Sequence, residues 1–211
     1  MPKMPQAGHA RPSPLVRRKR EPVLVDKEWG GIRIVTLKPE MVTRRIADWL
    51  TDPAVMEGLN APKQGDQLDA FRAYVGHFDN VARNLLLILE GDEPRGLLFL
   101  EIDPRHKTGS LHAIIGEEDN RGRGVAPMAA IAGSMHAFND RNIDKLTYMP
   151  LERNKAAIAI CEASNLKLEG ILREHRIDGR TGERLDQRIY GLTRKEYEAA
   201  MAVSATKVPK V

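Results

Sequence analysis

Cysteine is almost absent from this sequence, and long apolar runs are missing. The single cysteine, Cys161, cannot form a disulfide within the chain, so a reducing compartment fits best. No stretch approaches 18 uninterrupted apolar residues, so no segment is expected to span a membrane. The first residues lack the apolar core of a signal peptide, because prolines interrupt them and a basic run, 17–20, follows. These absences predict a cytoplasmic protein.

Positive charge gathers at the N-terminus. The chain carries a net charge of +4, but residues 1–22 alone carry +5, which leaves the rest at about −1. The basic residues of this leader are Lys3, Arg11, Arg17, Arg18, Lys19 and Arg20. Its proline-rich composition predicts a disordered leader over 1–22, a folded domain over 23–200 and a flexible tail over 201–211. A weak, salt-sensitive contact of the leader with RNA or another polyanion stays open, although no aromatic residue stands among its charges to stack on bases.

The apolar spacing between the two ends predicts one mixed α/β unit. Strands are expected over 32–37, 84–89, 96–102, 110–115, 145–149, 169–177 and 188–192, where short apolar runs are bounded by turn residues. Helices are expected over 44–50, 68–82, 125–139 and 154–164, with Thr43 and Asn154 as N-caps. The three strands between 84 and 115 follow one another closely, which is typical of an antiparallel meander.

A glycine–arginine loop joins the strand at 110–115 to the helix that begins near Val125. Free N–H groups at the start of a helix, together with about half a positive charge from its dipole, bind pyrophosphate. Gly122 and Gly124 let the backbone approach such a ligand, while Arg121 and Arg123 add charge-assisted contacts. The spacing matches neither the Walker loop nor the dinucleotide-binding glycine pattern. The loop therefore predicts a ligand with a diphosphate group.

Two segments together resemble the acetyl-CoA motifs of the Gcn5-related N-acetyltransferase (GNAT) superfamily. The first is Ile114-Ile115-Gly116-Glu117 followed by 120–126; the second is the strand at 145–149 followed by Asn154-x-x-Ala157-Ile158 and 168–170. The second segment and the ending at 189–197 look like the ribosomal-protein alanine acetyltransferase branch. The resemblance covers roughly 32–197. It implies a fold of the α/β class (α+β type), with a mixed, mostly antiparallel central sheet and helices on both faces.

The resemblance also implies acetyl-CoA as co-substrate and no metal. Pantetheine is then expected to lie between the strands at 110–115 and 145–149, pairing with the backbone of Ile114, Ile115 and Gly116. The amides that would hold the pyrophosphate are those of Arg121, Gly122, Arg123, Gly124, Val125 and Ala126. Asn154 would touch the pantetheine arm, and the acceptor would enter from the opposite side, over the helices of 44–82. Plainer roles stay open: Asn154 as an N-cap only, and Gly116 as a turn residue only.

The catalytic residues are less clearly marked. An amine attacks the thioester directly, and a backbone N–H near Ile115 is expected to stabilise the oxyanion. Some relatives carry a glutamate base on the strand before Asn154, where this chain has Met149. His112 is therefore the first candidate for the base, since its ordinary pKa near 6.5 suits the task, and Glu101 is the second. The place of the tyrosine acid in many relatives falls on Cys161, which is as readily a small core residue.

The resulting expectation is an acetyl-CoA-dependent N-acetyltransferase that acts on a primary amine in a ternary complex. The acceptor is a protein N-terminus, an amino sugar or another small amine. The alternative is a non-catalytic acetyl-CoA-binding module, and a nucleic-acid-associated protein is a third interpretation. The chain is expected to be a monomer or a homodimer.

Overall fold

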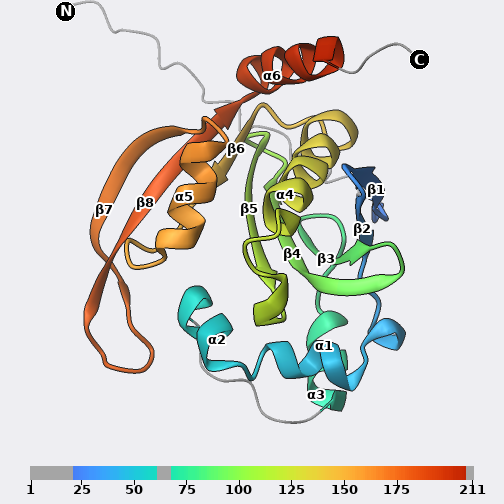
Figure 1. Cartoon of the computed structure of the whole chain (residues 1–211), viewed down its shortest axis with the longest axis vertical. Coiled ribbons are helices and arrows are strands. Elements are labelled where there is room, and N and C mark those ends of the chain that lie inside the picture. Colours follow the sequence, from blue (N-terminus) through green and yellow to red (C-terminus); the bar gives the residue numbers. More distant parts are fainter. Residues whose placement is uncertain (1–20, 61–67, 208–211) are drawn as a thin grey trace, which may run out of the picture.

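A computed structural model describes residues 21–60 and 68–207, which form one eight-stranded sheet flanked by helices (Figure 1). The strands are β1 (Asp26–Trp29), β2 (Ile32–Thr36), β3 (Arg83–Glu90), β4 (Glu93–Asp103), β5 (Thr108–Ile115), β6 (Lys145–Tyr148), β7 (Lys167–Ile177) and β8 (Arg184–Thr193). The helices are α1 (Arg44–Trp49), α2 (Pro53–Leu59), α3 (Leu68–Val75), α4 (Val125–Met135), α5 (Lys155–Ala163) and α6 (Arg194–Lys207).

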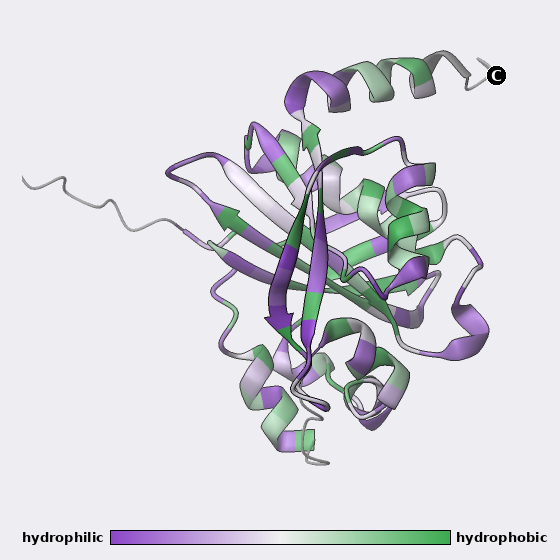
Figure 2. Cartoon of the chain, turned by 90° about the vertical axis from the view of Figure 1, so that its left-hand side faces the viewer, coloured by the Kyte–Doolittle hydropathy of each residue, from purple (hydrophilic) through white to green (hydrophobic). Residues whose placement is uncertain are grey.

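The strand order is β1-β2-β3-β4-β5-β6-β8-β7, and every neighbouring pair is antiparallel except β5 and β6. The predicted mixed, mostly antiparallel sheet with helices on both faces is therefore confirmed. The parallel pair arises because α4 crosses over between β5 and β6. The hydrophilic residues of the β7–β8 hairpin contrast with the apolar interior in Figure 2.

The two sheet faces belong to two separate apolar clusters. Strand β3 is buried on both faces, which explains its unbroken run of leucine and isoleucine. On one face Leu86, Leu98 and Leu111 pack with α4, whereas on the other Leu85, Phe99 and Ile114 pack with helices α1 to α3. The sheet therefore separates α4 from α1, α2 and α3.

Local capping signals set several helix starts. The Thr43 hydroxyl accepts the N–H of Ile46 at 3.4 Å, and the Asn154 side chain accepts that of Ala157 at 3.1 Å. Both predicted N-caps are confirmed. Helix α2 was not predicted, although Asp52 caps it and Pro53 occupies its first turn.

Three helix ends differ from the expectation. Helix α3 stops at Val75 rather than at 82, since the Asp79 carboxylate accepts the N–H groups of Val81, Ala82 and Arg83 and starts β3 instead. Helix α4 changes at His136 into a π-helical turn that ends at Asp140. Helix α6 was not predicted, and it ends at Lys207, beyond residue 201, where a flexible tail was expected.

The other terminal expectations concern residues that the structure does not describe. Nearly all of the leader, 1–20, and the last four residues, 208–211, lie outside the described ranges. Within 21–60 and 68–207, none of the helices combines the length and apolar character needed to cross a membrane.

Candidate acetyl-CoA site

Strands β5 and β6 separate soon after they meet. Only Thr108, Gly109 and Ser110 pair with β6, while β5 continues to Ile115 along β4. The Gly116 N–H donates to the Arg95 carbonyl on β4 at 2.9 Å, so by alternation the amide of Ile115 faces the side from which β6 has departed. On that side, residues 111–115 of β5 pair with no described strand, and the gap lies between the two strands where the pantetheine arm was expected.

The loop that follows β5 has the backbone of an anion site. After a 3₁₀ turn at Glu118–Asn120, Gly122 and Gly124 adopt left-handed conformations, with φ of +77° and +85°. A Cβ at either glycine would meet no atom within 4 Å, so the backbone conformation, rather than crowding, explains them. Gly124 caps α4 without a side-chain hydrogen bond, which leaves first-turn amides such as those of Val125 and Ala126 for a ligand.

The two arginines of the loop differ in their exposure to solvent and in their contacts. Arg123 is exposed, while Arg121 extends to within 3.6 Å of the Asp52 carboxylate at the start of α2. Nη2 of Arg121 is nevertheless buried without a hydrogen-bond partner among the described residues. A donor of this kind next to free amides is suited to an incoming anion.

Gly116 has a packing role beyond that of a turn residue. A Cβ built on it would lie only 2.1 Å from Cε2 of Trp49, whose ring covers this glycine from α1. Any other residue would force that buried ring to move. Asn154 lies at the other side of the opening, where its capping role leaves the amide nitrogen near Gly58 of α2, 3.4 Å from the position of a Cβ there.

His112 lies on the face of α1 to α3, opposite α4. Its ring stacks on Phe99, with centroids 4.6 Å apart and an angle of 10° between the planes. The His112 side chain is exposed to solvent by area, yet the protein atoms near the ring partly desolvate the charged imidazolium, which lowers the pKa of His112 to about 4. At neutral pH the ring is therefore uncharged and able to accept a proton.

Glu101 shares that face on the neighbouring strand, where it pairs with Ser110. It lines a shallow hollow of about 550 Å³ at the end of the sheet where β5 and β6 still pair. The residues around it include Arg83, Asp103, Ser110, Lys145 and Thr147, together with the apolar Ala82 and Ile102. His112 is not part of this lining, so the structure brings the two base candidates to one face without placing them in one hollow.

Cys161 lies on the α4 side, buried in α5, and its burial raises the pKa of the thiol to about 11. Tyr148, the last residue of β6, was not predicted as a site residue. Its hydroxyl lies 2.8 Å from Oγ of Ser134, which itself donates to the Ala130 carbonyl. Burial raises the pKa of Tyr148, and a Cys161 thiolate would raise it further, because the two groups lie close together. The sequence offers one indication of Tyr148, because it is a polar residue at the end of the strand that diverges from β5.

One protein family and several solved structures are similar to this chain. Residues 32–167 match the family model described as acetyltransferase (GNAT) domain. A comparison with curated proteins gave no match. Three solved structures superpose over most of their length, all below 25% identity, so they show a shared fold.

The first of the three is spermidine N-acetyltransferase from Vibrio cholerae in complex with CoA and spermine, at 18% identity and a TM-score of 0.71, covering 81% of this chain and 99% of that one. The second is RimL, a ribosomal L7/L12 alpha-N-protein acetyltransferase in complex with coenzyme A, at 17% identity and a TM-score of 0.71, covering 80% and 97%. A GNAT-family acetyltransferase from Bacillus anthracis has 13% identity and a TM-score of 0.70, covering 82% and 100%.

Proposed function

The chain belongs to the GNAT acetyltransferase family, and we propose that it transfers an acetyl group from acetyl-CoA to a primary amine by direct attack in a ternary complex. One observation carries the proposal: a glycine loop with free amides opens α4 beside the gap between β5 and β6. The two solved neighbours that contain coenzyme A support the choice of co-substrate.

In the proposed complex the pyrophosphate is held by the amides of residues 121–126 and by Arg121. The pantetheine arm lies along β5, pairing with the backbone of 114–116, and Asn154 borders it. The Ile115 N–H, which faces the opening, donates to the developing oxyanion. Such a fixed donor is effective because it needs no reorganisation during the reaction.

The amine approaches from the face of α1 to α3, where His112 and Glu101 lie on adjacent strands. A pKa near 4 makes His112 a weak base. We therefore propose that His112 accepts a proton from the ammonium group of the zwitterionic tetrahedral intermediate. That group is more acidic than a free ammonium ion. Glu101 remains the second candidate. Positioning of the two reactants supplies much of the rate, so a weak base is sufficient.

The departing thiolate needs a proton on the α4 side of the opening. Cys161, with a pKa near 11, is a poorer acid than an ordinary thiol, whose pKa is about 8.5. A solved RimL structure contains a disulfide between coenzyme A and one of its cysteines, so a cysteine can lie near the coenzyme A sulfur in this fold. Tyr148, the neighbour of Cys161, is the other hydrogen-bonding group there.

The solved neighbours indicate the chemical class of the acceptor only broadly. One acts on spermidine and another on a protein N-terminus. We propose a primary amine of either kind, a protein N-terminus or a small molecule. A panel of both, assayed for acetyl-CoA turnover, distinguishes them. Turnover with no amine, despite tight binding of coenzyme A, would favour the non-catalytic alternative.

Binding is tested with Gly124→Val. The substitution should abolish the rise in melting temperature that coenzyme A causes, because a branched side chain blocks the pyrophosphate. Valine is also strained at a φ of +85°, so Gly182→Val is the matched control: Gly182 has a φ of +77° and equally open surroundings, but lies in the β7–β8 turn. Equal affinity for coenzyme A in the wild type and both variants would refute the proposed function.

A further inference from the structure

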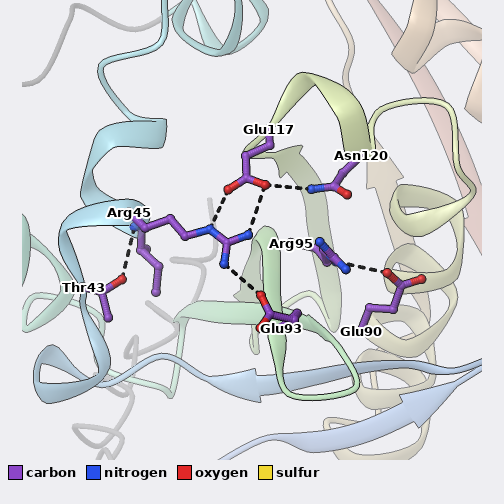
Figure 3. Close-up of polar contacts among 8 residues, drawn as sticks. Thr43, Arg45, Glu90, Glu93, Arg95, Glu117 and Asn120 are labelled. Atoms are coloured by element: carbon purple, nitrogen blue, oxygen red, sulfur yellow. Dashed lines mark hydrogen bonds and ion pairs between the residues drawn. The ribbon is translucent and has the colours of Figure 1, made fainter.

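Helix α1 extends a charged side chain to the entrance of the phosphate loop. Nε and Nη2 of Arg45 donate to the two carboxylate oxygens of Glu117, at 2.6 and 3.1 Å, while Nη1 donates to Glu93 at 2.9 Å (Figure 3). Glu93 is the first residue of β4, so the guanidinium is held between a strand end and the loop. A bidentate arginine–carboxylate pair fixes orientation as well as distance.

Glu117 passes this constraint on to the loop. Its Oε2 also accepts the side-chain amide of Asn120 at 3.1 Å, and Asn120 is only 4% exposed. Glu117 precedes the 3₁₀ turn and Asn120 is its last residue, and the turn leads directly into the arginine–glycine segment. Glu117 thus joins α1 to the backbone immediately before the predicted phosphate contacts.

Two more contacts from the same stretch of chain reach the loop. The Trp49 ring covers Gly116, and Asp52 lies 3.6 Å from Arg121. Residues 45–52 therefore touch the loop and its entrance at three successive points: Gly116, Glu117 and Arg121. Helix α4 packs on the other face of the sheet. The contacts from residues 45–52 therefore reach the loop from the face opposite α4.

We propose that Arg45 is a positioning residue that holds the phosphate loop, through Glu117, in the conformation that binds the diphosphate of coenzyme A. The proposal rests on the proposed function, since it concerns the same loop. Arg45 does not touch the ligand; it acts by removing loop conformations that would otherwise have to be ordered on binding. Preorganisation of this kind increases affinity without adding a contact.

Burial distinguishes this role from a merely stabilising one. The side chains of Arg45, Glu117 and Glu93 are 41%, 38% and 60% exposed, and ion pairs this exposed contribute little to global stability. Loss of Arg45 should therefore leave unfolding nearly unchanged while it weakens ligand binding. A residue needed only for the fold would affect both together.

The experiment measures coenzyme A binding by isothermal titration, with thermal unfolding in parallel. Arg45→Gln should raise the Kd for coenzyme A by about fivefold or more, equivalent to roughly one kcal/mol, with little change in Tm. Arg45→Lys, which keeps the charge but loses the fork, should fall in between. The matched control is Arg33→Gln, because Arg33 forms a bidentate pair of the same geometry with Asp26, at 2.7 and 2.6 Å, away from the loop.

A double-mutant cycle tests the route through Glu117. Glu117→Gln should weaken binding to a similar degree, and the double variant Arg45→Gln/Glu117→Gln should be little worse than either single one. In steady-state kinetics, Arg45→Gln should raise the KM for acetyl-CoA and leave kcat nearly unchanged.

Three results would overturn the proposal: unchanged coenzyme A affinity in Arg45→Gln, an equal loss in Arg33→Gln, or fully additive losses in the cycle. If the wild type itself does not bind coenzyme A, the proposed function fails instead. The two failures are therefore distinguishable.

Discussion

The contact between Gly116 and Trp49 supports the sharpest stability prediction. In Gly116→Ala the new Cβ would lie 2.1, 2.2 and 2.3 Å from Cε2, Cδ2 and Nε1 of Trp49. Carbon atoms in contact normally stand about 3.5–4.0 Å apart, so the ring or the backbone must shift by more than 1 Å. Trp49 is 4% exposed and packs among Leu97, Ile114 and the apolar residues of α1 to α3, which leaves the ring little freedom to turn away.

Overpacking of this kind costs about 1–3 kcal/mol, and a rigid, buried indole ring places the expected cost near the upper value. For a domain of this size each kcal/mol lowers the melting temperature by about 2–4 °C, so we expect a fall of about 6–12 °C. Calorimetry and urea unfolding measure it. Affinity for coenzyme A should fall as well, because Gly116 begins the connection to the phosphate loop.

The control for this substitution is Gly170→Ala on β7, where a Cβ would meet no atom within 4 Å and φ is not left-handed. Its effect should stay within about 0.5 kcal/mol. Replacing Trp49 with leucine should also reduce the additional cost of Gly116→Ala, since the clashing ring is gone. Equal melting temperatures for Gly116→Ala and Gly170→Ala would refute the reasoning from the close contact.

Two further predictions concern His112 and the leader. His112→Ala should lower kcat by about a hundredfold or more and spare coenzyme A affinity, and the wild-type acid inflection should lie near pH 4 rather than 6.5; an unchanged rate would assign His112 to structure. Because the folded pKa of His112 is lowered, its charging should also reduce stability as the pH falls from about 6.5 to about 4, an effect absent in the variant. Deleting residues 1–22 should leave turnover within about a few-fold, since the leader is proline-rich and carries no catalytic motif. A hundredfold loss would mean that the leader contacts the active site.

The elements predicted well from the sequence are those whose signals are local. The apolar run of β3 and the caps Thr43 and Asn154 depend on neighbours a few residues away, and all three appear where expected. Helix α3 ends early because the Asp79 side chain competes for three backbone N–H groups, which apolar spacing does not reveal. Helix α2 is short and was not predicted, although Asp52 and Pro53 mark its start.

The candidate site divides in the same way. Binding of a diphosphate by backbone amides is favoured by glycines in left-handed conformations before a helix, and Gly122 and Gly124 stand only two positions apart in the sequence. The contacts that hold the loop come from residues that are distant in the sequence. Arg45 and Glu117 are 72 positions apart, and their meeting depends on how α1 packs on the face of β4 and β5.

Strand alternation alone could not predict which face His112 occupies. Alternation divides the side chains of a strand between two faces, but it does not say which face an incoming amine meets. The neighbours decide. Leu111, Ala113 and Ile115 pack with the cluster beneath α4, so the intervening His112 must point to the face of α1 to α3, where it stacks on Phe99. The packing that keeps His112 away from the α4 face thus turns it toward the face assigned to the acceptor. The same environment lowers its pKa, so stacking on Phe99 and a proposed role as proton acceptor are compatible for this exposed side chain.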